Sequence, residues 1–347
     1  MIKSTSIKFG LVGCGRIAQN HFKAIKDHAE RAELVSICDI DDKVLKEAAK
    51  KTGAAPYNNY EEMLQQSKAD IIVLCTPSGL HARQAIQAAT AGYHVMTEKP
   101  MATNWEDGLS MVKVCKEEQV NLFVVKQNRK NKTLQLLRQA IEQNRFGKIY
   151  MVNINVFWTR PQEYYNMAAW RGTRAMDGGA LMNQASHYVD LISWLIGPLD
   201  SIHAFSGTLG RQIEVEDTIA LNLQWRSGVI GSMNVTMLTY PKNLEGSITI
   251  LGEKGSVKVG GVAVNEIVHW EFSEALEIDN QVKQASYETT SVYGYGHPLY
   301  YDNVINVMNN KEKPDTDGEE GLKSLEVLIA AYESAKHSNI VRLPLPR

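Results

Sequence analysis

The stretch Ile7-Lys8-Phe9-Gly10-Leu11-Val12-Gly13-Cys14-Gly15-Arg16-Ile17-Ala18 decides how this chain folds. A short apolar run ends in Gly-x-Gly-x-x-Ala, and a helical pattern begins at Ile17, which predicts a strand, a tight turn and a helix. Gly13 lets the turn close, Gly15 lets the backbone approach a pyrophosphate, and Ala18 lets the helix pack closely on the strand. The free N–H groups at the start of the helix then favour a bound anion.

A second apolar strand supplies the acid that such a site needs. Leu34–Cys38 ends at Asp39, 24 residues after Gly15. A carboxylate at that distance accepts hydrogen bonds from the ribose hydroxyls of a dinucleotide and repels a 2′-phosphate. The pattern therefore predicts NAD rather than NADP, although an ordinary strand-turn-helix with a surface aspartate would look the same. The residues expected to hold the pyrophosphate are Gly13, Cys14, Gly15, Arg16 and Ile17.

Length and composition limit the number of domains, the expected partners and the expected location of the protein. The chain has 347 residues, enough for about two domains. Its net charge of −2 offers no global field to attract nucleic acid or an anionic membrane, so neither is an expected partner. No apolar run approaches the length of a membrane span and no signal segment is apparent, so the cytoplasm is the default location. The four cysteines have neither disulfide nor zinc spacing, which predicts buried thiols and no metal site.

The first part of the chain alternates strands and helices. Strands are expected at 7–12, 34–38, 71–75, 94–97 and 121–125, and helices at 16–28, 42–51, 59–66, 80–91 and 104–118. Strands such as 71–75 are apolar throughout, as a sheet covered on both faces requires. We therefore predict an α/β Rossmann-type doubly wound parallel sheet in residues 1–126.

From about Ile149 onward the pattern changes to consecutive antiparallel hairpins. Strands are expected near 149–158, 202–207, 217–225, 229–238, 246–251 and 255–260, with helices near 179–196, 297–310 and 319–337. This pattern predicts an α+β domain over 127–347 with an open, mainly antiparallel sheet, the last helix being free to pack back on the first domain. Residues 248–251 are apolar on both faces of their strand, so we expect a second copy of the chain to cover the open face.

Two loops at the ends of predicted parallel strands carry candidate chemistry. Thr76 and Pro77, with His81 in the helix that follows, are expected to line the nicotinamide half of the cofactor, because strand ends face the ligand crevice. In Glu98-Lys99-Pro100, the lysine can hold a substrate oxygen and favour an alkoxide. A plain connection, a structural histidine and a surface lysine are the alternatives.

Two further clusters fall in the second domain. Asn183 and His187 are four residues apart, which places them on one face of the expected helix. A neutral histidine can take a hydroxyl proton at physiological pH. Arg160, Arg171 and Arg174 occur among several aromatic residues, and arginine forks suit carboxylates and phosphates. They indicate an anionic substrate, unless the stretch is a salt-bridged surface loop.

Together these motifs resemble the Gfo/Idh/MocA family over essentially the whole chain, through Gly13 to Ala18, Thr76-Pro77 with His81, Glu98-Lys99-Pro100, and Gly178-Gly179 with His187. The resemblance implies that Lys99 and His187 are catalytic. Many members have an aspartate where this chain has Asn183, which moves proton transfer onto His187 or Lys99. The other cofactor contacts that it implies are Asp39, Thr76, Pro77, His81, Glu98, Lys99, Gln127, Trp170 and Arg171. The substrate contacts that it implies are Lys99, Arg160, Tyr164, Asn183 and His187.

Within that family, the segments 126–129, 157–165, 170–173, 182–190, 215–218 and 240–246 look like those of bacterial UDP-N-acetylglucosaminuronate 3-dehydrogenases. This similarity implies NAD-dependent oxidation of the 3-hydroxyl of a UDP-sugar uronate, on the route to surface polysaccharide. It also implies a homotetramer and reoxidation of tightly bound NADH by 2-oxoglutarate. The alternatives are a dehydrogenase of a free sugar or inositol, an NAD-dependent glycosidase on the same scaffold, and a nucleotide sensor without catalysis.

Overall fold

The computed structural model describes residues 6–261, 263–289 and 294–347. By its internal contacts the chain divides into two units, which we describe separately. The first contains Met1–Lys126 and His297–Leu325, and the second contains Gln127–Gly296 and Glu326–Arg347. Among the described residues no helix is both long and apolar enough to cross a bilayer.

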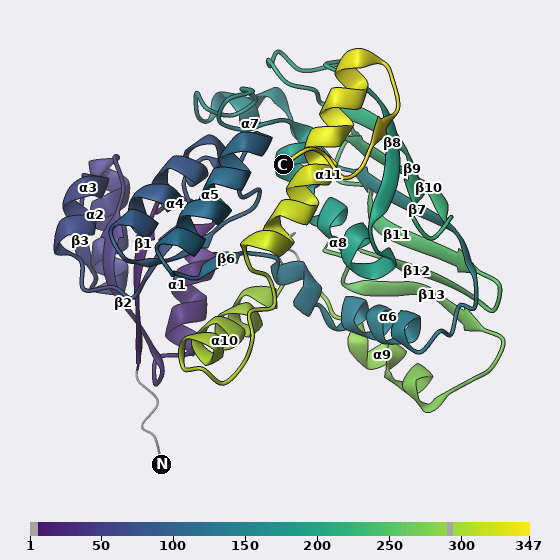
Figure 1. Ribbon diagram of the computed structural model, residues 1–347, viewed down its shortest axis with the longest axis horizontal. Coiled ribbons are helices and arrows are strands. Elements are labelled where there is room, and N and C mark those ends of the chain that lie inside the picture. The colour runs from purple at the N-terminus through teal and green to yellow at the C-terminus, as the bar shows by residue number, and fades with distance from the viewer. Residues whose placement is uncertain (1–5, 262, 290–293) are drawn as a thin grey trace. The chain divides into compact units, whose positions relative to one another are not determined.

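The first unit is built on a six-stranded parallel sheet in the order β3-β2-β1-β4-β5-β6 (Figure 1). Its strands are β1 (Ile7–Val12), β2 (Ala32–Cys38), β3 (Ala55–Tyr57), β4 (Ile71–Leu74), β5 (His94–Thr97) and β6 (Leu122–Val124). The order reverses between β1 and β4, which is where open parallel sheets bind ligands. The predicted Rossmann-type sheet is confirmed. Strand β3 was not predicted, because its three residues include a proline, lie at the sheet edge and form no apolar run.

Helices connect these strands and cover the sheet. They are α1 (Ala18–Asp27), α2 (Asp42–Thr52), α3 (Tyr60–Gln66), α4 (His81–Thr90) and α5 (Trp105–Glu117). Helices α4 and α5 lie side by side (Figure 1). All four residues of β4 are completely buried, as the uninterrupted apolar run predicts. The four cysteines are free and buried, as expected.

A segment near the C-terminus completes the first unit. It contains most of α10 (Gly296–Met308) and the start of α11 (Gly318–His337). The Tyr301 ring lies 5.2 Å from the ring of Phe9 in β1, and the hydroxyl of Tyr300 donates to the carbonyl oxygen of Val124, 2.9 Å away. Residues 297–325, which the sequence pattern places in the domain over 127–347, therefore pack into the core of the first unit.

The second unit is built on an eight-stranded mixed sheet in the order β13-β12-β11-β7-β10-β9-β8-β14. Its strands are β7 (Ile149–Phe157), β8 (Leu199–Gly207), β9 (Thr218–Trp225), β10 (Ile230–Thr236), β11 (Glu245–Gly252), β12 (Gly255–Gly260), β13 (Glu266–Phe272) and β14 (Val341–Arg342). The mainly antiparallel α+β domain is confirmed. The prediction of consecutive antiparallel hairpins is wrong at one point. Strand β7 lies between β10 and β11 and pairs with β10 in parallel.

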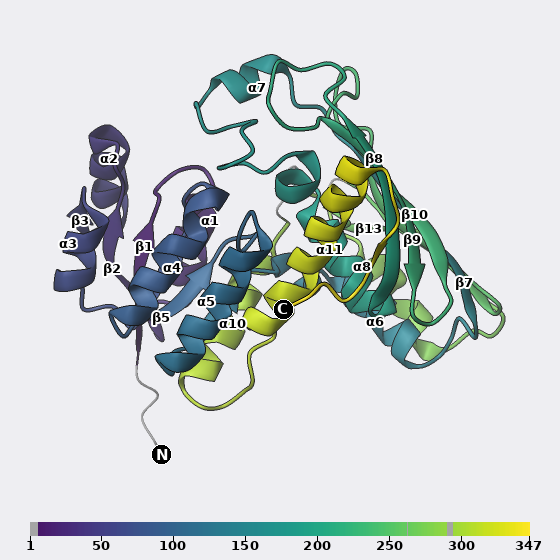
Figure 2. The same ribbon diagram turned by 45° about the horizontal axis from the view of Figure 1, so that its top comes forward.

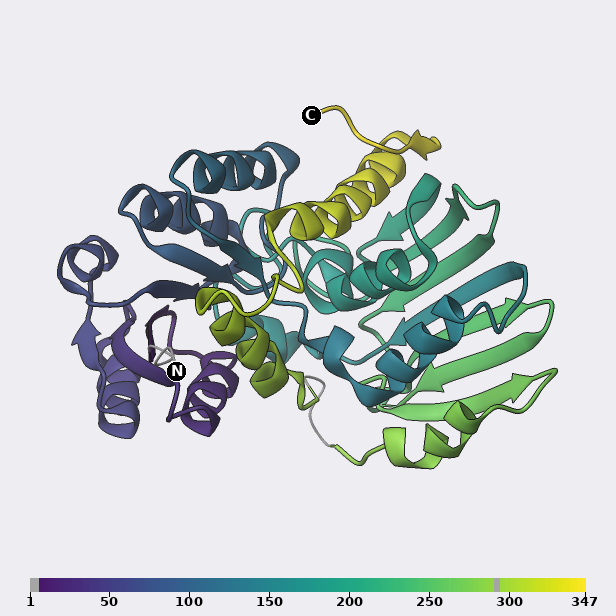
Figure 3. The same ribbon diagram turned by 60° about the horizontal axis from the view of Figure 1, so that its bottom comes forward.

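Helices α6 (Lys132–Glu142), α8 (Ser186–Ile196) and the end of α11 lie on one face of this sheet (Figures 2 and 3). The short helices α7 (Gln162–Asn166) and α9 (Val282–Ala285) lie in its connections. Helix α6 and strands β13 and β14 were not predicted from the sequence. The prediction of a single helix over 179–196 is also wrong. A π-helix, Ala180–Gln184, precedes α8, and Ala185 lies between them. Asn183 and His187 therefore do not share one regular helical face.

Candidate active site

The glycine-rich turn after β1 has the shape that a dinucleotide requires. Gly13 has φ +88°, and a Cβ there would lie 2.7 Å from the carbonyl oxygen of Cys75, so only glycine fits. A Cβ on Gly15 would have no neighbour within 4 Å, which leaves space above the turn. The first turn of α1 has no side-chain cap. Its N–H groups therefore suit a phosphate.

The acid after β2 is joined to the same turn. One oxygen of Asp39 accepts from the backbone N–H of Cys14, 2.7 Å away, and the other accepts from the N–H of Asp41, at 2.9 Å. The Cys14 side chain is buried, and that burial raises the pKa of its thiol to about 12. Cys14 therefore offers a ligand only its backbone, whereas Asp39 links the phosphate turn to the expected ribose position.

The loops after β4 and β5 are tied together by His81. Its Nδ1 lies 2.8 Å from the carbonyl oxygen of Pro100, and its Nε2 lies 2.9 Å from that of Thr76. Burial lowers the pKa of this imidazole, and the two backbone hydrogen bonds oppose that shift. His81 thus positions the loop that contains Thr76 and Pro77 against the loop that follows Lys99. Its direct contact with a cofactor stays a prediction.

Glu98 lies at the centre of a buried hydrogen-bond network. One carboxylate oxygen accepts from His21 Nε2 at 2.9 Å and lies 3.4 Å from His297 Nε2, and the other accepts from the N–H of Lys99. The hydroxyl of Tyr301 lies 2.8 Å from His21 Nδ1. Burial alone would raise the pKa of Glu98, but its histidine partners hold that pKa well below the usual range.

This network explains what Glu98 does in the first unit. Both of its oxygens are used within the protein, so the side chain anchors α1 and α10 to the loop that begins with Lys99. The ligand atoms of Glu98, His21 and His297 lie within 4.8 Å of one another, a spacing that a metal ion could bridge. The hydrogen bonds account for the cluster without one.

In the second unit, His187 is held from the turn that begins with Gln127. The side-chain amide nitrogen of Gln127 lies 3.1 Å from His187 Nε2, and both residues are buried. Two residues further along this turn, Arg129 makes two hydrogen bonds of 2.8 Å to Asp190, which lies one turn after His187 on α8. This buried, bidentate pair fixes α8 against the turn, so Gln127 can control which imidazole nitrogen carries the proton.

Asn183 has an acidic partner that the sequence analysis did not select. Its amide donates to one oxygen of Asp177, and the other oxygen of Asp177 accepts from the N–H of Gly172, 2.8 Å away. Asp177 is buried. An acid is therefore present beside the position where many family members have one, but it comes from the preceding loop. The only sequence signal was that Asp177 directly precedes Gly178-Gly179.

The three arginines selected from the sequence have different surroundings. Arg171 lies over the Tyr164 ring at 4.2 Å and the Trp170 ring at 4.6 Å, and Arg160 lies over Tyr164 at 5.5 Å. The buried Nε of Arg171 has no hydrogen-bond partner among the described residues. Arg174 is instead exposed and pairs with Glu214, 3.7 Å away. Arg160 and Arg171 therefore share one aromatic platform, and Arg174 is a surface residue.

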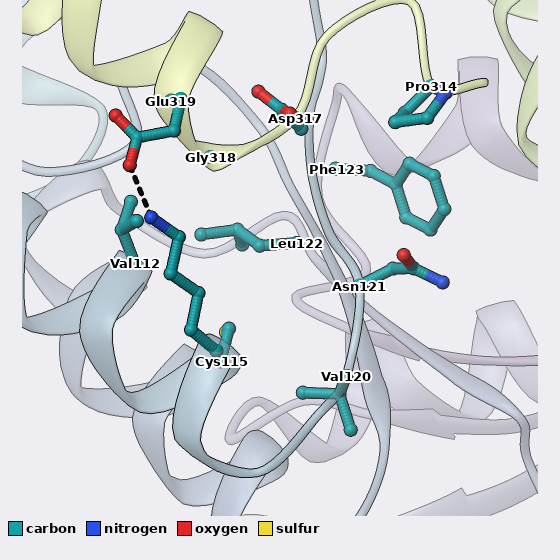
Figure 4. Close-up of a pocket in the computed structure, with 11 residues that line it drawn as sticks. Val112, Cys115, Val120, Asn121, Leu122, Phe123, Pro314, Asp317, Gly318 and Glu319 are labelled. Carbon is teal, nitrogen blue, oxygen red and sulfur yellow. Dashed lines mark hydrogen bonds and ion pairs between the residues drawn. The ribbon is translucent and has the colours of Figure 1, made fainter.

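A pocket of about 180 Å³ in the first unit lies elsewhere (Figure 4). It is lined by the end of α5, the residues leading into β6, and residues 314–319, and the ion pair between Lys116 and Glu319 crosses part of it. The pocket adjoins the amino end of β6, whereas the glycine-rich turn lies at the carboxyl end of the parallel strand β1. The two are therefore at opposite ends of the strands. None of the residues expected to bind cofactor or substrate lines the pocket, and burial raises the pKa of the Cys115 thiol to about 11.

Comparison with known proteins identifies close relatives. The chain is 63% identical to the WlbA dehydrogenase from Chromobacterium violaceum, whose crystal structure contains NADH and UDP-GlcNAcA; the match covers 100% of this chain and 98% of that one, with a TM-score of 0.96. It is 61% identical to the WlbA dehydrogenase from Bordetella pertussis, in complex with the same two ligands, over 100% of both chains, with a TM-score of 0.97.

More distant relatives share the arrangement of the whole chain. Myo-inositol 2-dehydrogenase from Thermotoga maritima is 24% identical over 97% of this chain and 98% of its own length. Residues 7–126 match the NAD-binding Rossmann fold of an oxidoreductase family, and residues 138–343 match the C-terminal alpha/beta domain of the same family. The chain therefore belongs to the Gfo/Idh/MocA oxidoreductase family, whose N-terminal domain binds NAD.

Proposed function

We propose that this protein oxidises the 3-hydroxyl of UDP-GlcNAcA to a 3-keto sugar, with NAD as the hydride acceptor. The observation that carries the proposal is the likeness, over the full chain and at 61–63% identity, to dehydrogenases crystallised with NADH and UDP-GlcNAcA. The glycine-rich turn, Asp39, Lys99 and His187 are all present in this chain. A nucleotide sensor needs neither the lysine nor the histidine.

The first unit fits NAD. The open space above Gly15 and the uncapped first turn of α1 suit a pyrophosphate, and Asp39 at the end of β2 suits an unphosphorylated ribose. Gln127 is a further expected cofactor contact, and its buried amide oxygen has no partner among the described residues. The remaining cofactor contacts expected from the sequence, at Thr76, Pro77 and Trp170, are part of the proposal.

Proton transfer is assigned to His187 and Lys99. When NAD is bound, it supplies the site that accepts the hydride. The side-chain amide of Gln127 lies 3.1 Å from Nε2 of His187 and so sets which imidazole nitrogen takes the proton. Lys99 is half-buried after β5 and stabilises negative charge on the reacting oxygen, while His187 takes the hydroxyl proton. Both residues orient and polarise the same hydroxyl in this proposal.

An anionic sugar nucleotide suits the arginine platform. Arg171 keeps a buried Nε–H without a partner in the described chain, and Arg160 shares the Tyr164 ring with it. UDP-GlcNAcA carries a diphosphate and a carboxylate, and planar guanidinium groups bind both kinds of anion. A free sugar or inositol offers no anion to the buried Nε–H of Arg171, which favours the nucleotide sugar.

We also propose that the enzyme acts as a homotetramer in the cytoplasm, on a route to surface polysaccharide, with 2-oxoglutarate reoxidising NADH. The open sheet face supports a contact between copies of this chain. Met151, Ile230 and Leu251 form a row across three neighbouring strands, and they are 43%, 52% and 40% exposed. Such a cross-strand apolar row is suited to burial against a second subunit.

The test is to incubate the protein with UDP-GlcNAcA and NAD and to follow absorbance of the reduced nicotinamide, with and without 2-oxoglutarate. Net NADH or reduction of 2-oxoglutarate, together with a 3-keto product seen by NMR, supports the proposal. Release of UDP without net NADH would indicate the glycosidase alternative, and turnover of myo-inositol or free glucuronate alone would indicate a free-sugar dehydrogenase.

Variants then test the two catalytic assignments. Lys99→Met and His187→Asn should each lower kcat by about 10²–10⁴-fold and leave NADH binding intact. The exposed Lys113, replaced by Met, is a matched control with no expected effect. If either active-site variant keeps wild-type turnover, that residue has no role in proton transfer.

A further inference from the structure

The π-helix that carries Asn183 begins without a cap of its own. Its first three residues, Ala180, Leu181 and Met182, have N–H groups that lie too early in the helix to bond within it. Gly179 precedes them with φ +114° and provides no side chain. Regular pairing begins only where the N–H of Asn183 bonds to the carbonyl oxygen of Gly179, at 2.9 Å. The three earlier N–H groups need partners from elsewhere in the unit.

Glu216 and Tyr332 supply all three partners. The N–H of Ala180 bonds to the backbone oxygen of Glu216 at 3.3 Å, and the N–H of Leu181 bonds to its side-chain oxygen Oε1 at 2.9 Å. The N–H of Met182 bonds to the hydroxyl of Tyr332 at 3.0 Å, and that hydroxyl in turn donates to Oε1 of Glu216 at 2.8 Å. One carboxyl group from the residues before β9 thus organises the start of this helix.

The fit around this carboxyl group is close. A Cβ on Gly179 would lie 2.1 Å from Glu216 Oε2, so the glycine is needed for the carboxyl group to reach the helix. Glu216 is only 8% exposed. The same turn contains Asn183 and leads, through Ala185, directly into the first turn of α8 and His187. A displacement of the π-helix would therefore displace both predicted site residues together.

We infer that Glu216 is a positioning residue for the reaction: its carboxyl group, together with Tyr332, fixes the π-helix that places Asn183 and His187. This inference rests on the proposed function, because it assigns those two residues to the substrate. Glu216 acts through the hydrogen bonds that it accepts from the N–H of Leu181 and the hydroxyl of Tyr332.

The environment of Glu216 makes the positioning sensitive to pH. Asp177 faces it from the loop before the π-helix and Tyr332 from α11, while its neighbour Asp217 is turned to the N–H groups of residues 209–211. Burial raises the pKa of Glu216 to about 7, and the hydrogen bonds from Leu181 and Tyr332 oppose that shift. The ionised carboxylate accepts these bonds more strongly than the acid does, so the contacts at the helix start strengthen as pH rises through neutrality, although burying the charge lowers the stability of the unit as a whole.

The experiment compares Glu216→Ala and Glu216→Gln with the exposed neighbour Glu214→Gln as control. For Glu216→Ala we expect kcat to fall about 10- to 100-fold while NADH binding is unchanged. Glu216→Gln, which keeps an acceptor oxygen, should recover part of that loss. It should also remove from the pH profile of kcat the component that titrates near pH 7. Glu214→Gln should match the wild type in every measurement.

Hydrogen–deuterium exchange of residues 178–187 provides a readout independent of activity. Exchange of this segment should be faster in Glu216→Ala and in Tyr332→Phe than in the wild type. Unchanged kcat and unchanged exchange would overturn the inference, as would equal losses in both Glu216 variants with an unaltered pH profile. Wild-type inactivity on UDP-GlcNAcA would instead refute the proposed function, and exchange would still decide the role of Glu216 at the helix start. If Glu216→Ala does not fold, Glu216→Gln and Tyr332→Phe make the same test.

Discussion

Replacing Glu98 by Gln should destabilise the first unit more than any exposed isosteric change. The carboxylate accepts from His21 Nε2 at 2.9 Å and lies 3.4 Å from His297 Nε2, in a site where Glu98 is 5% exposed. A glutamine keeps one acceptor oxygen and replaces the other by a donor. Because one oxygen serves both histidines and the other serves the N–H of Lys99, the glutamine places its donor either against the Lys99 N–H or against the histidines, so at least one buried donor loses its acceptor and the remaining hydrogen bonds lose their charge.

The magnitude follows from these two losses. An unpaired buried donor costs about 1–3 kcal/mol, and charge assistance adds about 1 kcal/mol to a hydrogen bond, so we expect Glu98→Gln to cost about 2–4 kcal/mol. For a unit of about 150 residues this corresponds to a fall in Tm of about 4–16 °C. Thermal unfolding followed by circular dichroism measures it, with the exposed Glu47→Gln as control.

The pH dependence sharpens this test. Because the folded-state pKa of Glu98 is held below its usual value, the stability it contributes is present above about pH 4.5 and is lost as pH falls. The difference in stability between wild type and Glu98→Gln should therefore be full at pH 7 and shrink in acid. A fall in Tm no larger than that of the control at pH 7 would refute the proposed role of the network.

Three further predictions concern the cofactor, the base and the buried acid. Asp39→Ser should raise affinity for NADP relative to NAD at least about tenfold, measured by fluorescence titration, because the carboxylate that repels a 2′-phosphate is removed; an unchanged ratio would exclude Asp39 from the ribose site. Gln127→Leu should lower kcat about 10- to 100-fold with little change in KM, because the tautomer of His187 is no longer fixed; a change in KM alone would contradict this. Burial raises the pKa of Glu216 to about 7, so its folded form favours the proton and its contribution to stability declines as pH rises from about 4.5 through 7. Glu216→Gln should therefore be more stable than the wild type at pH 8, by at most about 3 kcal/mol, and no more stable at pH 5, as chemical denaturation would show.

The sequence by itself determined the features that depend on local patterns. The apolar runs of β1, β2, β4 and β5, separated by amphipathic helices, fix the parallel sheet, and Gly13, Gly15 and Asp39 fix its cofactor edge. These signals are readable because each needs only near neighbours along the chain: a run buried on both faces, a turn that closes at positive φ, and an acid at the end of the next strand. The same locality made the Glu98-Lys99-Pro100 loop recognisable.

Tertiary structure decided what depends on partners far apart in the sequence. Glu98 contacts His21 and His297, which are 77 and 199 residues away in the sequence, so no local pattern predicted the network. Glu216 and Tyr332 bind the first N–H groups of the π-helix before His187 from 35 and 150 residues further along the chain. Periodicity therefore predicted an unbroken helix there. The sequence shows which hydrogen-bonding groups the chain contains. Which buried donor pairs with which buried acceptor depends on the folded structure, because the partners are far apart in the sequence.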